Sequence, residues 1–115
     1  MLREIGGYIE LDKYTGEMIH DNAIALNSGR NCLAYLVQTK KIKKLLVPFF
    51  MCDCVKEICS KESVTIRYYS INTDFLPQNN IVLDNNEWLY LVNYYGLLDN
   101  QQIKKIVNKL FNSLP

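Results

Sequence analysis

Three short segments of this 115-residue chain carry side chains that could bind or react with a ligand. They are Asn27-Ser28-Gly29-Arg30-Asn31, Pro48-Phe49-Phe50-Met51-Cys52-Asp53 and Asn93-Tyr94-Tyr95-Gly96. Each segment follows a short apolar run that is typical of a buried strand. Open parallel sheets bind ligands at the carboxyl ends of their strands. We therefore expect the chemistry of the chain to lie in these segments.

The first segment is a small turn at the start of a predicted helix. Unpaired backbone N–H groups and the positive end of the helix dipole converge at such a point, which favours a phosphate. Gly29 permits close approach, Ser28 and Asn31 can add hydrogen bonds, and Arg30 can add charge. A capped helix, in which Ser28 and Asn31 bind only their own backbone, explains the same residues, and spacing alone favours it. The sequence contains neither a P-loop nor a G-x-G-x-x-G pattern.

The other two segments offer a thiol, a carboxylate and an amide. Cys52 could be a thiolate at a helix N-terminus, where the pKa of a thiol falls. No histidine lies near it in sequence to act as a base, so a Cys–His hydrolase has little support. His20, which is the one histidine, lies in a turn-like region and is expected to be exposed. Asn93 and Tyr95 could face a ligand, although the tyrosines suit packing equally well.

The cysteines and the net charge exclude several classes of protein. Cys32, Cys52, Cys54 and Cys59 are a poor disulfide framework and lack the two close pairs of a typical zinc site, so reduced thiols are expected. A net charge of +1 argues against nucleic-acid binding. The sequence has no run of 18 apolar residues, so no membrane span is predicted, and residues 1–7 lack the apolar core of a signal peptide. We therefore expect a cytoplasmic protein.

The elements that would position these residues alternate between helix and strand periods, which predicts an α/β fold. Residues 8–11 indicate a strand or extended arm, residues 12–17 a turn, and residues 23–26 a short buried strand. We expect an N-terminal arm over residues 1–22 and an α/β unit over residues 23–115. Its sheet should be mainly parallel and flanked by helices, with right-handed crossovers.

A helix follows residue 28, and it should bury Cys32, Leu33, Leu36 and Val37 and end at Lys40–Lys44. Five further elements come after it. Residues 45–47 predict a strand buried on both faces, and a helix from Asp53 should turn Val55, Ile58 and Cys59 inward. Residues 64–68 indicate a half-exposed edge strand, whereas residues 87–92 predict the most central strand. The final helix begins with a capping box, Asp99 with Gln102, and buries one face: Ile103, Ile106, Val107, Leu110 and Phe111.

In order and spacing, the segments resemble the N-terminal half of the large domain of the DegT/DnrJ family. These are fold-type I, pyridoxal-phosphate-dependent sugar aminotransferases, with the motifs S-G-T-x-A-L, V-P-x-x-T-F, G-x-x-P-x-F-x-D-I-D and V-H-x-Y-G. The matching stretches are residues 27–33, 47–52, 64–72 and 92–96. The resemblance covers the chain from about residue 23 to its end.

The resemblance implies a role for six residues. Gly29, Arg30 and Asn31 would hold the cofactor phosphate at the helix start, and Ser28 would support the turn. Cys52 stands where the family has an aromatic that stacks on the pyridine ring, and Asn93 stands where it often has histidine. Arg30 replaces the usual threonine. These departures indicate a divergent branch of the family.

The resemblance also implies that this chain is inactive alone. The aspartate that pairs with the pyridine nitrogen and the lysine that forms the Schiff base lie downstream of these motifs in the family. The chain would be a fragment, a truncated reading frame, or a half completed by another polypeptide or a homodimer partner. Two other interpretations remain open: a non-enzymatic α/β binding or interaction module, and a small phosphate binder that kept only the turn.

Overall fold

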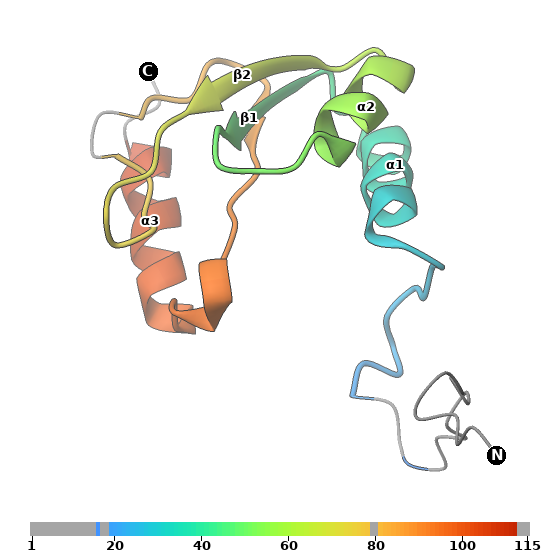
Figure 1. Cartoon of the computed structure of the whole chain (residues 1–115), viewed down its shortest axis with the longest axis horizontal. Helices are drawn as coiled ribbons and strands as arrows, with labels where there is room; N and C mark the ends of the chain where they lie inside the picture. Colours follow the sequence, from blue (N-terminus) through green and yellow to red (C-terminus); the bar gives the residue numbers. More distant parts are fainter. Residues whose placement is uncertain (1–15, 17–18, 79–80, 113–115) are drawn as a thin grey trace, which may run out of the picture.

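The computed structural model describes residue 16, residues 19–78 and residues 81–112. Within them it is an α/β fold with three parallel strands and flanking helices, as the sequence predicts (Figure 1). The elements are α1 (Gly29–Lys40), β1 (Lys44–Pro48), α2 (Cys54–Lys61), β2 (Thr65–Tyr69), β3 (Glu87–Leu89), the short 3-10 helix η1 (Tyr94–Gly96) and α3 (Asn100–Asn112). The predicted strand at residues 8–11 lies outside the described residues.

The sheet has the order β2-β1-β3, so β1 is its centre. Leu45, Leu46 and Val47 are 1–3% exposed, because neighbouring strands and both faces of the sheet cover them. β2 lies at an edge, as the sequence predicts. The prediction that residues 87–92 form the central strand is wrong, because β3 is an edge strand of three residues in which Trp88 is 44% exposed.

Pro48 explains why β3 stops so early. The N–H of Tyr90 still donates to the carbonyl of Leu46, at 2.8 Å. The next bond of a parallel ladder would come from residue 48, but a proline has no N–H to donate. The Tyr69 hydroxyl donates to the Tyr90 carbonyl instead, at 2.8 Å. The chain therefore leaves the sheet after Leu89 without leaving that carbonyl unpaired.

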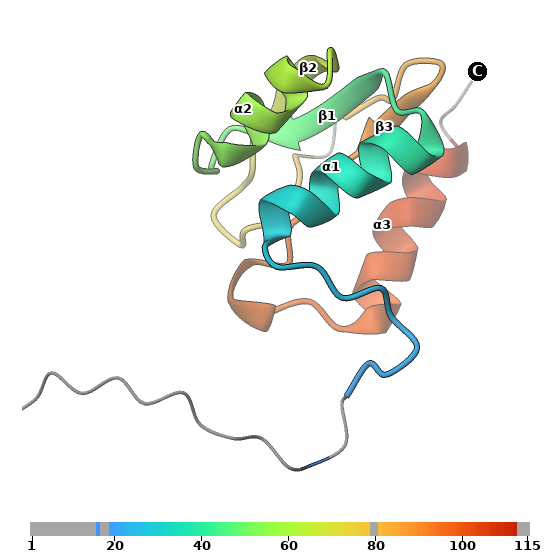
Figure 2. The same ribbon diagram turned by 90° about the vertical axis from the view of Figure 1, so that its right-hand side faces the viewer.

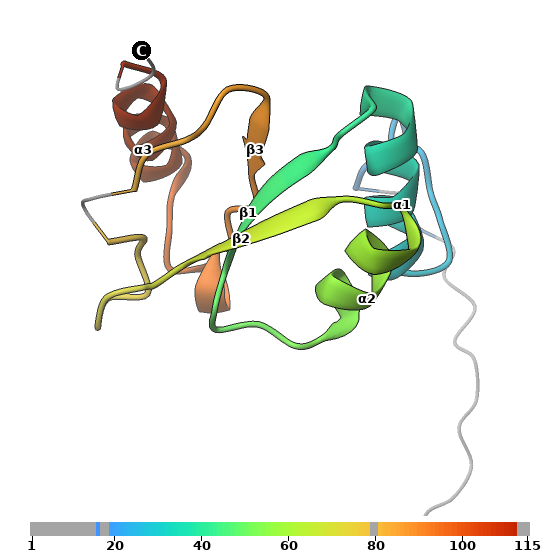
Figure 3. The same ribbon diagram turned by 90° about the horizontal axis from the view of Figure 1, so that it is seen from above.

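The two faces of the sheet carry different helices. α1 and α2 lie on one side and α3 on the other (Figures 2 and 3). The main core fills the first side with buried residues from α1, α2 and β1, extended by Ile42 and Val64 from the connections: Leu33, Val37, Ile42, Leu45, Val47, Val55, Cys59 and Val64. Leu46 points to the other face, since side chains alternate along a strand. This arrangement agrees with the prediction of helices on both faces of the sheet.

The helix ends follow the local sequence. Ser28 caps α1, and Lys41 ends it in the left-handed conformation, with its N–H donating to the Val37 carbonyl. At the start of α3 the Asp99 carboxylate accepts from the Gln102 N–H at 2.8 Å, and the Gln102 side chain accepts from the Asp99 N–H at 2.9 Å. The predicted capping box is therefore confirmed.

Some of the expected burial is wrong. Residues 23–26 form no strand, and Ile24 is 64% exposed, because no strand among the described residues pairs with them. Cys32 and Leu36 are exposed, so α1 buries only the narrower stripe of Leu33 and Val37. On α3, Val107 is 49% exposed, because it lies at the margin of the buried face.

Candidate functional site

A cavity of about 540 Å³ lies where the N-termini of α1 and α2 meet. It is lined by Ser28, Gly29, Arg30, Leu33, Cys54, Val55 and Tyr90. α1 runs antiparallel to β1, so its N-terminus lies at the carboxyl end of that strand (Figure 2). α2 begins at the same end, shortly after β1. The first and second predicted segments therefore converge at one edge of the sheet, although no strand precedes Ser28.

The start of α1 presents two backbone donors to this cavity. The first helical hydrogen bond runs from Cys32 N–H to the Ser28 carbonyl, at 3.0 Å, and the Asn31 N–H donates to Ser28 Oγ at 3.2 Å. The N–H groups of Gly29 and Arg30 have no acceptor among the residues that the structure describes. Gly29 and Arg30 thus line the cavity, whereas the Asn31 N–H is held by the cap.

Asn31 and Gly29 behave differently at this turn. The Asn31 side-chain amide donates to Asn27 Oδ1, so it serves the turn itself. A Cβ atom built at Gly29 would meet no other atom within 4 Å, apart from its chain neighbours and the backbone of its own helix turn. The space beside Gly29 is therefore open at the point where a ligand or a substituted side chain would enter.

Two thiols stand beside the Arg30 guanidinium. Cys52 Sγ and Cys54 Sγ are 2.8 Å apart, and Asp53 between them has helical backbone angles (φ −70°, ψ −8°) at the start of α2. The Cys54 side chain and backbone N–H donate to Cys52, and these bonds, aided by Arg30, lower the pKa of Cys52. The pKa of Cys54 is raised, mainly because its proton serves that bond. Cys52 is therefore the thiol that ionises first.

Tyr90 covers the cavity from the first residue after β3. Its ring packs against the main core, and burial raises the pKa of its hydroxyl. Tyr90 and Cys54 line the cavity although neither was predicted from the sequence as a site residue. The Cys-x-Cys spacing across a helix start was a usable signal for Cys54. The position of Tyr90 depends on where β3 leaves the sheet, which is a long-range effect.

Cys52 and Asn93 lie apart from the cavity lining. Cys52 faces the neighbouring hollow beside Pro48 and Asp53, and reaches the cavity only through its contact with Cys54. The Asn93 side chain binds Leu98 twice: its Nδ2 donates to the carbonyl and its Oδ1 accepts from the N–H, both at 2.9 Å. The Asn93 amide therefore closes the η1 turn. Its Nδ2 and Oδ1 atoms, which a ligand would need as partners, are already used by Leu98.

Aromatic rings gather at the same carboxyl edge. The Tyr94 hydroxyl donates to the Phe50 carbonyl, at 2.5 Å, and joins the ends of β1 and β3. The ring centroids of Phe50 and Tyr94 are 5.5 Å apart, and Phe75 packs against both. Phe50 and Tyr95 are 55% and 78% exposed. Tyr95 adds a further ring to this edge. Its backbone has the left-handed conformation (φ 56°), which costs about 1–3 kcal/mol in a non-glycine residue.

None of the described residues that line the cavity is a lysine. Lys104 and Lys105 are exposed on α3, across the sheet from α1 (Figure 3). Among the described residues, no three His, Cys, Asp or Glu side chains are arranged to hold a metal ion. Among the described residues, the cavity therefore offers hydrogen-bond donors, a cation and the Cys54 thiol, but no amine that could form a Schiff base.

Comparison with known proteins leaves the family open. A scan against protein-family models matched none, and searches of curated proteins and of solved structures found no significant similarity. In the part of the chain that the structure describes, no helix has both the length and the apolar character needed to cross a membrane.

Proposed function

We propose that this chain binds a phosphate ester of the pyridoxal phosphate kind in the cavity at the start of α1. The proposal rests on the N–H groups of Gly29 and Arg30, which have no acceptor in the part of the chain that the structure describes and lie beside open space and a guanidinium. Backbone donors at a helix N-terminus favour an anion, and an arginine adds a charge-assisted bond. The exposed position of this turn limits the expected affinity, because water and salt screen the charges.

The lining residues fit one part of this cofactor and not another. Gly29 and Arg30 suit the phosphate, while Leu33, Val55 and Tyr90 offer an apolar surface for a ring. When bound, the group would supply an electron sink for amino-group chemistry. Since no lysine of the described chain lines the cavity, we propose non-covalent binding and assign no catalytic residue to this chain. Amino transfer to a keto-sugar or a related carbonyl is proposed only for a complete protein.

The two edge strands of the sheet indicate that another polypeptide covers part of it. Neither β2 nor β3 has a further strand on its outer side within the described residues, and Trp88 at the β3 edge is 44% exposed. Open edges with apolar side chains are unfavourable unless another strand or chain covers them. We propose that a second polypeptide, either a complementary half or a second copy of this chain, covers β3.

The test of phosphate binding uses a substitution that the fold tolerates. Gly29→Leu places a side chain in the open space and keeps a good helix former at the start of α1. By calorimetry, we expect pyridoxal phosphate and inorganic phosphate to compete for one site in the wild type. Gly29→Leu should weaken both by about tenfold or more, because it blocks approach to the two N–H groups.

Ser60→Leu on the exposed far end of α2 is the matched control, and it should bind like the wild type. Unchanged affinity in Gly29→Leu would contradict the site. Treatment with pyridoxal phosphate and borohydride should leave no stoichiometric adduct on any single lysine. A single stoichiometric lysine adduct would contradict non-covalent binding, even if the phosphate site were correct.

A second candidate function is a non-enzymatic interaction module. The exposed aromatic rings at the carboxyl edge favour it, since Phe49, Phe50 and Tyr95 are 55–78% exposed. In that case the Ser28 and Asn31 contacts only cap α1, and neither ligand would bind. If Phe50→Ser abolishes binding to a partner and Gly29→Leu leaves that binding unchanged, the result favours this second function.

A further inference from the structure

We propose that Cys52 and Cys54 form a redox-active dithiol that exchanges with low-molecular-weight disulfides and closes into an intramolecular disulfide. The two sulfurs are 2.8 Å apart. The proposal goes beyond phosphate binding, because it needs neither the cofactor nor the N–H groups of α1.

The two thiols have different surroundings that suit two roles. Cys52 is exposed, whereas Cys54 is half-buried at the first position of α2. Hydrogen bonds from Cys54 and the nearby Arg30 guanidinium stabilise the Cys52 thiolate and lower its pKa. A thiolate is the form that attacks a disulfide, so Cys52 is the attacking residue and Cys54 the resolving one.

The short distance between the two sulfurs supports closure. At 2.8 Å, the sulfurs need to approach by less than about 1 Å to reach the length of a disulfide bond. Cys59 is fully buried and does not compete, and its pKa is raised by that burial.

The exchange has two balanced steps. Cys52 Sγ attacks one sulfur of the small disulfide, forming a mixed disulfide and releasing the other half as a thiolate. Cys54 then loses its proton to water, and its Sγ attacks Cys52 Sγ. The Sγ–Sγ bond forms, the mixed-disulfide bond breaks, and the second half leaves as a thiolate. The cysteines lose two electrons, which reduce the small disulfide to two thiols.

The experiment treats the full reduced chain with oxidised glutathione at neutral pH, followed by acid quenching, alkylation of free thiols and peptide mass mapping. We expect a Cys52–Cys54 disulfide without retained glutathione. In Cys54→Ser, glutathione should remain on Cys52, because the resolving thiol is absent. If the wild type retains glutathione on Cys52 as stably as Cys54→Ser does, the proposal is wrong.

The alkylation rate of the reduced protein provides an independent measurement. Cys32, an exposed thiol on α1, is the internal control. Cys52 should react with iodoacetamide about tenfold faster than Cys32 at neutral pH, and Arg30→Gln should reduce the ratio. Circular dichroism of each variant checks that it is folded. Equal rates at Cys52 and Cys32 in the folded wild type would overturn the assignment of Cys52 as the attacking thiol.

Discussion

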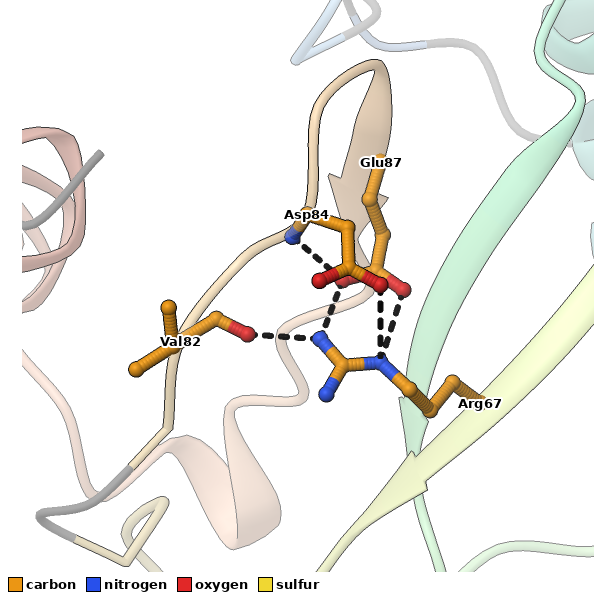
Figure 4. A network of polar contacts seen from close by, with 4 residues as sticks. All are labelled: Arg67, Val82, Asp84 and Glu87. Carbon is orange, nitrogen blue, oxygen red and sulfur yellow. Dashed lines mark hydrogen bonds and ion pairs between the residues drawn. The ribbon is translucent and has the colours of Figure 1, made fainter. Parts of the chain in front are cut away.

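Arg67 on β2 reaches across the central strand and donates to Glu87 on β3 (Figure 4). Its Nε lies 3.0 Å from Glu87 Oε2, and its Nη2 donates to Oε1. The same Nη2 donates to the Val82 carbonyl, while the Asp84 N–H donates to Glu87 Oε1 at 3.1 Å. The Glu87 side chain is only 3% exposed, whereas that of Arg67 is 46% exposed. One guanidinium therefore joins both edges of the sheet and the loop that enters β3.

Arg67→Ala should destabilise the fold by about 2 kcal/mol, because it leaves the buried Glu87 carboxylate without its cation. This figure is below the usual range for a buried pair, since Arg67 is half-exposed and partly screened by water. Arg67→Lys should recover only part of the loss, because an ammonium cannot make both bonds in the plane of the carboxylate. Urea unfolding at neutral pH measures the three free energies. A wild-type value for Arg67→Ala would show that the pair contributes nothing.

The same pair should make stability depend on pH. The hydrogen bond from Arg67 is the main cause that holds the pKa of Glu87 below its ordinary value. A carboxylate with a lowered pKa stabilises the folded state above the pKa of the unfolded chain, which is about 4.3. That contribution is lost as the pH falls through the lower pKa of the folded state. Stability should therefore decrease with acid below about pH 4.5.

Glu87→Gln isolates this effect, since glutamine cannot titrate. It should lower stability at neutral pH and flatten the decrease between pH 5 and pH 3, relative to the wild type. Glu57→Gln, on the exposed side of α2, is the control and should leave the pH profile almost unchanged. A Glu87→Gln profile parallel to that of the wild type would exclude Glu87 as the titrating group.

Local sequence was sufficient to predict the features that depend on neighbouring residues. The Asp99–Gln102 capping box and the Ser28 cap each use residues three apart, so the pattern contains all the groups involved. Arg30 and Gly29 line the cavity because they are adjacent to that cap. The edge position of β2 also follows from its alternating side chains.

Long-range pairing was not predictable in the same way. The run Glu87–Val92 is apolar enough for a central strand, but Pro48 on the neighbouring strand removes the donor that would continue the ladder. Residues 23–26 have the composition of a strand, yet pairing needs a partner that the described chain does not supply. Tyr90 enters the cavity for the same reason that β3 is short. None of these effects is visible in a local window.

Asp99→Ala should destabilise α3 by about 1 kcal/mol, because it removes the acceptor for the Gln102 N–H and breaks the reciprocal pair. Hydrogen exchange of the amides in the first turn of α3 should accelerate more than that of β1. Asn108→Ala, in the exposed middle of the same helix, is the matched control and should be neutral or slightly stabilising. Equal exchange in Asp99→Ala and the wild type would contradict the role of the cap.

Substitution of Asn93 can separate a structural role of this residue from a role in ligand binding. Its side chain makes both hydrogen bonds with Leu98, a buried residue just before α3. Asn93→Ala should therefore cost about 1–2 kcal/mol of stability, because both backbone groups of Leu98 lose their partner. Pyridoxal phosphate binding by the folded variant should be unchanged, since Asn93 is not among the residues that line the cavity. A wild-type unfolding free energy combined with lost binding would place Asn93 at the ligand, as the family resemblance implies, and would contradict its role in closing the turn.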